Sequence, residues 1–177
     1  MFFSCPLCTG GSRDEIAGQV AEHGWHLTAV LPSNGRPGWA YSVGLWHTFR
    51  HPEVAIFGLP PGRNGLVNVA AEVVREGRQL TPGGVLSEVL IGYPMSLRLA
   101  DPAWSELFPG LAEFYSASPV PVVQLVWPDQ DGRFPWDRGF DECFRESQPL
   151  LWLAADDHPP GEWLRVLRSA QASQRQR

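Results

Sequence analysis

The segment VPVVQLVW, residues 120–127, most constrains what this chain can fold into. It is rich in β-branched residues and is bounded by Pro121 and Pro128, a combination that predicts a β-strand. A second apolar run, EVAIFGL at residues 53–59, ends at Pro60 and predicts a short buried strand. We therefore expect a sheet of short strands that are separated by turns and helices.

Helical patterns alternate with further strands along the chain. Ser12 and Glu15 have the spacing of a capping box, which predicts a helix over residues 12–23 that stops at Gly24. The other expected elements are an antiparallel pair of strands at 25–31 and 39–45, a helix within 64–77, two short strands or one broken strand within 85–99, a helix over 103–115 that is kinked or split at Pro109, a last strand at 148–154, and a short helix from Glu162.

This order of elements predicts an α+β (mixed α/β) fold. We expect a single compact domain, with a mixed or mainly antiparallel sheet and packed helices, because hairpins and helical crossovers are mixed along the chain. A length of 177 residues suits one domain with its own core. Residues 12–168 are expected to form this domain, residues 1–11 a flexible N-terminal segment with a Cys-x2-Cys pair, and residues 169–177 a polar C-terminal tail.

Composition narrows the classes of partner. The formal net charge of -5 argues against nucleic acid, whose backbone phosphates need clustered Lys and Arg. No apolar run reaches the roughly 18 residues that a membrane span requires. The N-terminal MFFSCPLC lacks a basic region and a long apolar region, so it does not read as a signal peptide. A cytoplasmic location with three reduced thiols, on Cys5, Cys8 and Cys143, is therefore expected.

Four stretches in order carry a family resemblance: HGW (23–25), WAYSVGL (39–45), HPEVAIFGLP (51–60) and QLVWPDQDGRFPWDRGFD (124–141). Together they resemble the DUF4262 family of bacterial proteins, over roughly residues 5–152. The resemblance implies a compact bacterial cytosolic protein and carries no reaction or cofactor with it. The positions that match the family's motifs are Tyr41, Gly44, Leu45, His51, Pro52, Glu53, Gly132, Trp136 and Asp137, while Ser42 stands where Thr is usual.

The stretch GLWHTFRHPE, residues 44–53, places two histidines and a glutamate close together in the sequence. His47 and His51 are four residues apart, a spacing that lets two imidazoles share a metal on one helical face, with Glu53 as a third ligand. Pro52 disfavours helical backbone at His51, however. Three interpretations stay open: a metal site, an acid/base role for His51 with Glu53 as its acceptor, and a structural role.

A second candidate metal site lies near the N-terminus. Cys5 and Cys8 precede His23 and His26 at a spacing close to that of Cys2His2 zinc sites, although the histidine gap is one residue short. Gly24 is also expected to separate the two histidines. We therefore predict at most a zinc site that is made by Cys5, Cys8 and His23, and the alternative is two free thiols.

The loop WPDQDGRFPWD, residues 127–137, is acidic and aromatic. Asp129 and Asp131 resemble the start of a calcium loop, but Phe140 stands where an EF-hand needs its bidentate glutamate, so an EF-hand is excluded. The loop follows a strand, which is a common place for a polar site. Asp137 could serve such a site, or it could pair with Arg133 or cap the next turn.

Two functional hypotheses follow. The first is an enzyme that modifies a small molecule or peptide, with His51, Glu53 and Asp137 as catalytic residues. Its pocket would be lined by Tyr41, Trp46, Trp127, Arg133 and Trp136. The second is a non-catalytic binding or regulatory module that acts through protein–protein contacts, with exposed Trp and Arg as anchors. A shared cleft for His51, Tyr41 and Asp137 would favour the enzyme, and an exposed patch of tryptophans would favour the module.

Overall fold

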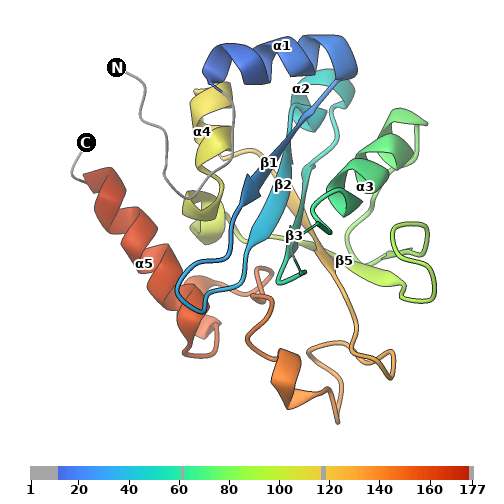
Figure 1. The fold of residues 1–177 in the computed structure, drawn as a ribbon, viewed down its shortest axis with the longest axis vertical. Coiled ribbons are helices and arrows are strands. Elements are labelled where there is room, and N and C mark those ends of the chain that lie inside the picture. The colour runs from blue at the N-terminus through green and yellow to red at the C-terminus, as the bar shows by residue number, and fades with distance from the viewer. Residues whose placement is uncertain (1–11, 61, 117–118, 176–177) are drawn as a thin grey trace.

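A computed structural model describes residues 12–60, 62–116 and 119–175 (Figure 1). In these residues a six-stranded sheet has the order β1-β2-β3-β6-β5-β4. The strands are β1 (His26–Val30), β2 (Trp39–Val43), β3 (Glu53–Phe57), β4 (Val85–Leu86), β5 (Met95–Leu99) and β6 (Val122–Val126). The strand expected from VPVVQLVW is β6, and all five of its residues are buried.

Only one pair of neighbouring strands in this sheet is parallel. β3 and β6 run side by side in the same direction, with Val54 opposite Val123, whereas every other pair is antiparallel. The α+β class with a mixed sheet is therefore confirmed. Since β3 and β6 end at the same edge, the segments that follow Phe57 and Val126 leave the sheet together.

Helices cover both faces of the sheet. α3 (Leu66–Arg75) packs its buried residues, among them Val67 and Ala71, on one face. The other face is covered by α1 (Arg13–His23), α4 (Pro109–Tyr115) and α5 (Glu162–Arg175), which contribute Ile16, Leu111 and Trp163 to a second apolar cluster. Figure 1 shows α3 and α5 on opposite sides of the strands.

Two expected helix boundaries are confirmed by their local chemistry. The Ser12 side chain accepts a hydrogen bond from the Glu15 N–H, the Glu15 carboxylate returns one to the Ser12 N–H, and Gly24 ends α1 with a φ of 95°. Pro109 splits the segment before β6 into a 3-10 helix, η1 (Pro102–Leu107), and α4. Two further 3-10 turns follow β6, at η2 (Glu142–Phe144) and η3 (Ala155–Asp157).

The prediction of a last strand at residues 148–154 is wrong, because the chain forms a turn there. Instead, the Gln124 side chain of β6 forms hydrogen bonds with the backbone of this segment. Its amide group donates to the Pro149 carbonyl at 2.7 Å and accepts from the Leu151 N–H at 3.2 Å. The C-terminal helix is also longer than expected. α5 continues to Arg175, well into the residues predicted as a polar tail.

The segment between β2 and β3 contains a single helical turn, α2 (Leu45–Phe49). Arg50 has a φ of 54° and ends this helix, so His51 lies outside it. The paired arrangement of His47 and His51 on one helical face is therefore not formed. Within the described residues, no helix has both the length and the apolar character that crossing a bilayer requires.

Candidate functional site

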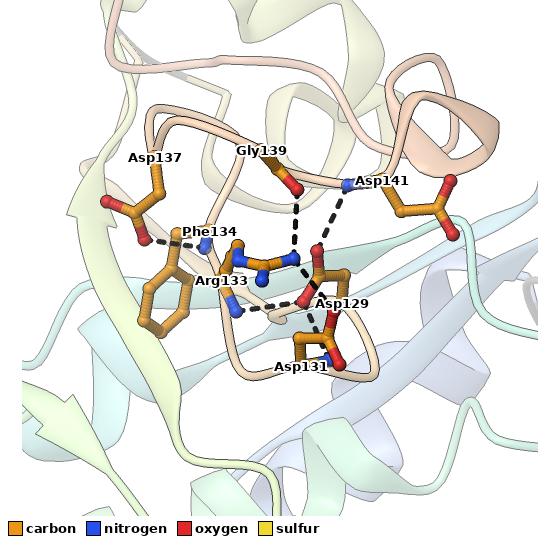
Figure 2. Close-up of polar contacts among 7 residues, drawn as sticks. All are labelled: Asp129, Asp131, Arg133, Phe134, Asp137, Gly139 and Asp141. Atoms are coloured by element: carbon orange, nitrogen blue, oxygen red, sulfur yellow. Dashed lines mark hydrogen bonds and ion pairs between the residues drawn. The ribbon is translucent and has the colours of Figure 1, made fainter.

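The loop after β6 is organised around one buried carboxylate, that of Asp129 (Figure 2). Its Oδ1 accepts hydrogen bonds from the backbone N–H groups of Asp131 and Arg133, both at 2.9 Å, and its Oδ2 accepts one from Asp141 at 3.0 Å. Burial acts to raise the pKa of Asp129, but these backbone donors outweigh it and leave the pKa below its ordinary value. A single side chain therefore fixes both ends of the loop.

Arg133 and Asp137 are used inside the same loop. The Arg133 guanidinium pairs with Asp131 at 2.7 Å and donates to the Gly139 carbonyl at 3.1 Å, and the Asp137 carboxylate accepts from the Phe134 N–H at 2.8 Å (Figure 2). Asp137 thus closes a local turn, in line with the structural alternative for this residue. No hydrogen bond or ion pair in the described chain joins it to Arg133 or His51.

The loop presents Trp136 at the surface, where 41% of the residue is exposed. Its ring stacks on Phe134 with centroids 4.9 Å apart and meets the edge of Trp152 at 5.2 Å. The guanidinium carbon of Arg98 lies 4.2 Å from the Trp136 ring centre and 5.6 Å from that of Trp152. We call these four residues, Arg98, Phe134, Trp136 and Trp152, the aromatic patch.

Arg98 reaches the patch from β5, where it lies opposite Gln124 of β6. Its Nε is buried and has no hydrogen-bond acceptor, and no ion pair of Arg98 occurs in the described part of the chain. A guanidinium stacked on indole gains a cation–π interaction, which offsets part of the cost of removing it from water. Its buried Nε–H nevertheless remains an unused donor within the described residues.

His51, the residue predicted as a proton carrier, is fully buried with both ring nitrogens engaged. Nε2 accepts a hydrogen bond from the Leu80 N–H at 2.9 Å, so the proton is on Nδ1, which donates to the Pro52 carbonyl at 2.7 Å. Burial lowers the pKa of His51 and favours this neutral form. The imidazole therefore links the end of α2 to the segment that follows α3.

Glu53 is fully buried at the start of β3, where five groups donate hydrogen bonds to it. The donors are the hydroxyls of Ser42 and Tyr115, at 2.6 and 2.5 Å, and the backbone N–H groups of Gly44, Leu45 and Trp46. The carboxylate thus caps the first turn of α2. Burial raises the pKa of Glu53, and Glu53 forms no hydrogen bond with His51.

The remaining residues of the predicted pocket lie in different places. The Tyr41 hydroxyl accepts from the Gly110 N–H at 3.0 Å beneath α4. Trp46 is half-buried on α2, and Trp127 donates through its indole N–H to the Phe57 carbonyl at 2.7 Å. Tyr41 and Trp127 thus belong to the two separate apolar clusters on opposite faces of the sheet.

The described residues contain no group of three or more His, Cys, Asp or Glu side chains that could hold a metal ion. His23 is exposed beside Glu22, and His26 is buried in β1 with Nδ1 2.7 Å from Gln19. Gly24 separates the two histidines, as expected. The predicted zinc ligands Cys5 and Cys8 lie outside the described residues, so this zinc site stays a prediction.

Sequence reasoning missed Arg98, Trp152 and Tyr115. Arg98 had a usable signal, because it is the one charged residue of the strand MSLRL. Trp152 lies in the segment 148–154, which the sequence analysis predicted as a strand and not as part of a site. Tyr115 had no local signal, since its partner Glu53 is 62 residues away in the chain.

One of three comparisons with known proteins found a match. A family model described as "Domain of unknown function (DUF4262)" matches residues 19–141, more than half of the chain. The match covers the sheet from β1 to β6 and includes Arg98, Phe134 and Trp136, whereas Trp152 lies beyond it. A search of curated proteins and a search of solved structures each found no match.

Proposed function

Because the chain belongs to the DUF4262 family, which is defined by a domain of unknown function, we infer its role from its own geometry. We propose that it is a non-catalytic binding module whose aromatic patch docks a protein partner. One observation carries the proposal. Trp136 is a large aromatic side chain that is 41% exposed and lies against the Arg98 guanidinium, whose buried Nε has no acceptor among the described residues.

The composition of the patch supports this role. Trp and Arg are the side chains most enriched among the residues that dominate binding energy at protein interfaces. An exposed tryptophan can transfer a large apolar surface out of water when a partner covers it. A monomeric surface gains little from keeping such a residue exposed, so a docking role accounts for its position.

The patch is also preorganised. Asp129 holds the loop through three backbone hydrogen bonds, Phe134 and Trp152 fix the orientation of Trp136, and β5 provides a rigid base for Arg98. A surface that is already ordered loses less conformational entropy when it binds. This favours recognition through a fixed surface rather than through a segment that folds on binding.

Arg98 indicates the chemistry of the partner. A guanidinium presents donors in a planar fork that matches a carboxylate, and its flat faces are already against indole rings. We therefore propose that the partner is a protein segment in which an acidic side chain or C-terminal carboxylate adjoins an apolar side chain. The carboxylate would pair with Arg98, while the apolar group would cover Trp136.

The enzyme hypothesis receives less support from the geometry. Its proton carrier, His51, has both ring nitrogens committed to backbone groups, and its supposed partners Glu53 and Asp137 form their hydrogen bonds elsewhere. A general base has to reach a substrate proton within hydrogen-bond distance. Docking at the aromatic patch does not require His51, Glu53 or Asp137 to change their hydrogen bonds.

We further propose that the protein is bacterial and that it is located in the cytoplasm. Cys143 is exposed and is a free thiol. Thiols of this kind are maintained in reducing compartments and tend to be oxidised outside the cell. Thiol titration after denaturation without reductant should find three reactive groups, and a Cys143 disulfide would oppose this location.

A peptide selection tests the docking proposal. Random peptides are displayed and selected on the full chain, in parallel with Trp136→Ala and with Ile91→Ala. Ile91 is the matched control because it is an apolar side chain that is 95% exposed outside the patch. We expect the wild type and Ile91→Ala to enrich the same sequences, with Asp or Glu next to an apolar residue, and Trp136→Ala to lose them. Identical enrichment on all three proteins would refute the proposal.

A further inference from the structure

A cavity of about 310 Å³ lies between η1, α4, the end of β5 and the start of β6. It shares no residue with the aromatic patch. Its apolar lining includes Leu99, Phe108, Leu111 and Val122. This volume is at the lower end of the range that small-molecule sites occupy, and such sites combine apolar walls with a few polar groups.

The charged residues that line the cavity are both acidic: Asp101 and Glu106. Asp101 uses Oδ1 to accept from the Ala103 N–H at 2.9 Å, while no hydrogen bond to its Oδ2 occurs in the described part of the chain. Glu106 is half-buried on η1, and within the same residues its carboxylate takes part in no hydrogen bond or ion pair. The cavity therefore offers uncommitted anionic acceptors.

Tyr115 adds no free donor to the cavity, whose uncharged polar lining residues also include Ser105 and Gln174. Tyr115 is a lining residue, but its hydroxyl already donates to Glu53 at 2.5 Å and accepts from the His47 N–H at 3.2 Å. Burial and the adjacent Glu53 carboxylate raise the pKa of Tyr115, so this hydroxyl keeps its proton and keeps donating it to Glu53. It is thus not free to donate to a ligand.

We propose that this cavity binds a small apolar amine, meaning a single ammonium group on an aliphatic or aromatic body. The apolar walls would take up the body of the ligand. The ammonium would lie against Glu106 and Asp101, whose negative charges complement it and whose free oxygens accept its N–H groups. The site is separate from protein docking at the aromatic patch.

Titration calorimetry with three probes of similar size tests this proposal. Phenethylamine carries the cation, 2-phenylethanol is its neutral analogue, and phenylacetate carries the opposite charge. We expect the full chain to bind phenethylamine about tenfold more tightly than 2-phenylethanol, which is the size of effect that a charge-assisted hydrogen bond produces. Phenylacetate should bind weakest. Equal affinities for the amine and the alcohol, or no binding of the amine, would overturn the proposal.

Three variants locate the binding. Glu106→Gln should weaken phenethylamine about tenfold and leave 2-phenylethanol unchanged, because it removes the charge and keeps the shape. Glu113→Gln is the control, since this exposed residue of α4 makes the same change in net charge outside the cavity lining. Ala112→Phe, at an exposed lining position, should weaken both ligands. If Glu113→Gln weakens the amine as much as Glu106→Gln, or if Ala112→Phe weakens neither ligand, the proposed site is wrong.

Discussion

The Arg98 guanidinium lies 4.2 Å from the centre of the Trp136 ring, although β5 carries one residue and the loop after β6 the other. The contact joins the sheet to the loop without an ion pair. It leaves an exposed aromatic side chain beside a cation whose Nε has no acceptor in the part of the chain that the structure describes. The stability of the fold and the function of the patch should therefore respond differently to substitution of Trp136.

Trp136→Ala should cost less stability than a core tryptophan does. Trp104 is 0% exposed and packs in the cluster beneath α5, so Trp104→Ala should lower the free energy of unfolding by about 3–5 kcal/mol. Trp136→Ala removes only partly buried surface and should cost about 1–2 kcal/mol. Urea unfolding of both variants measures this difference. Equal losses would mean that Trp136 is a core residue rather than a presented one.

Asp129→Ala should loosen the whole loop, whereas Asp137→Ala should act locally. Without the Asp129 carboxylate, the N–H groups of Asp131, Arg133 and Asp141 lose their acceptors, so their hydrogen exchange should become faster. Asp137→Ala removes an acceptor only from the Phe134 N–H and serves as the matched control. If exchange at Asp141 is the same in both variants, Asp129 does not organise the loop.

The contact between Tyr115 and Glu53 should contribute to stability. Tyr115→Phe removes one donor from a fully buried carboxylate and should lower the free energy of unfolding by about 1–3 kcal/mol. Glu53→Ala should cost more, since the N–H groups of Gly44, Leu45 and Trp46 would then lose their acceptor. Denaturant unfolding compares the two variants. A Tyr115→Phe protein as stable as the wild type would contradict this interpretation.

His51 should make the fold sensitive to acid. Because burial lowers its pKa in the folded state, the unfolded chain binds a proton more readily. The stabilisation from neutral His51 is therefore present above the unfolded pKa, near 6.5, and is lost as the pH falls through it. Burial lowers the pKa of His26 and His158 as well, which adds to the same trend.

Unfolding experiments between pH 8 and about pH 5 measure this dependence. His51→Gln should flatten the dependence, and it should also lower stability at pH 8, because Leu80 loses its imidazole acceptor. His47→Gln is the control, since His47 is exposed on α2. If both variants keep the slope of the wild type, the buried His51 is not a source of the acid sensitivity.

The elements of the fold were largely predictable because their signals are local. The capping box at Ser12 and Glu15 and the break at Pro109 act through neighbouring residues, and periodicity identified the strands. The strand prediction for residues 148–154 was wrong for a physical reason. Its apolar pattern suits a strand, but the side chain of Gln124 takes up its backbone groups, and periodicity does not report such a contact.

The candidate site was predictable only in part. Trp136 and the acidic loop stood out in the sequence, but the roles of His51 and Glu53 depend on partners from distant segments, Leu80 and Tyr115. Reactive side chains near each other in a sequence suggested chemistry. In the folded chain, each of these side chains instead forms hydrogen bonds with a different backbone or hydroxyl group. The spacing of residues in the sequence does not reveal these partners.

The central claim, that the aromatic patch is a docking surface, is tested most directly by one calorimetric comparison. A peptide selected on the wild-type chain is titrated into the wild type, Trp136→Ala and Ile91→Ala. Loss of an interface anchor costs about 2 kcal/mol or more, so Trp136→Ala should weaken binding about thirtyfold, and Ile91→Ala should leave the affinity unchanged. Equal affinity for the wild type and Trp136→Ala would contradict the claim.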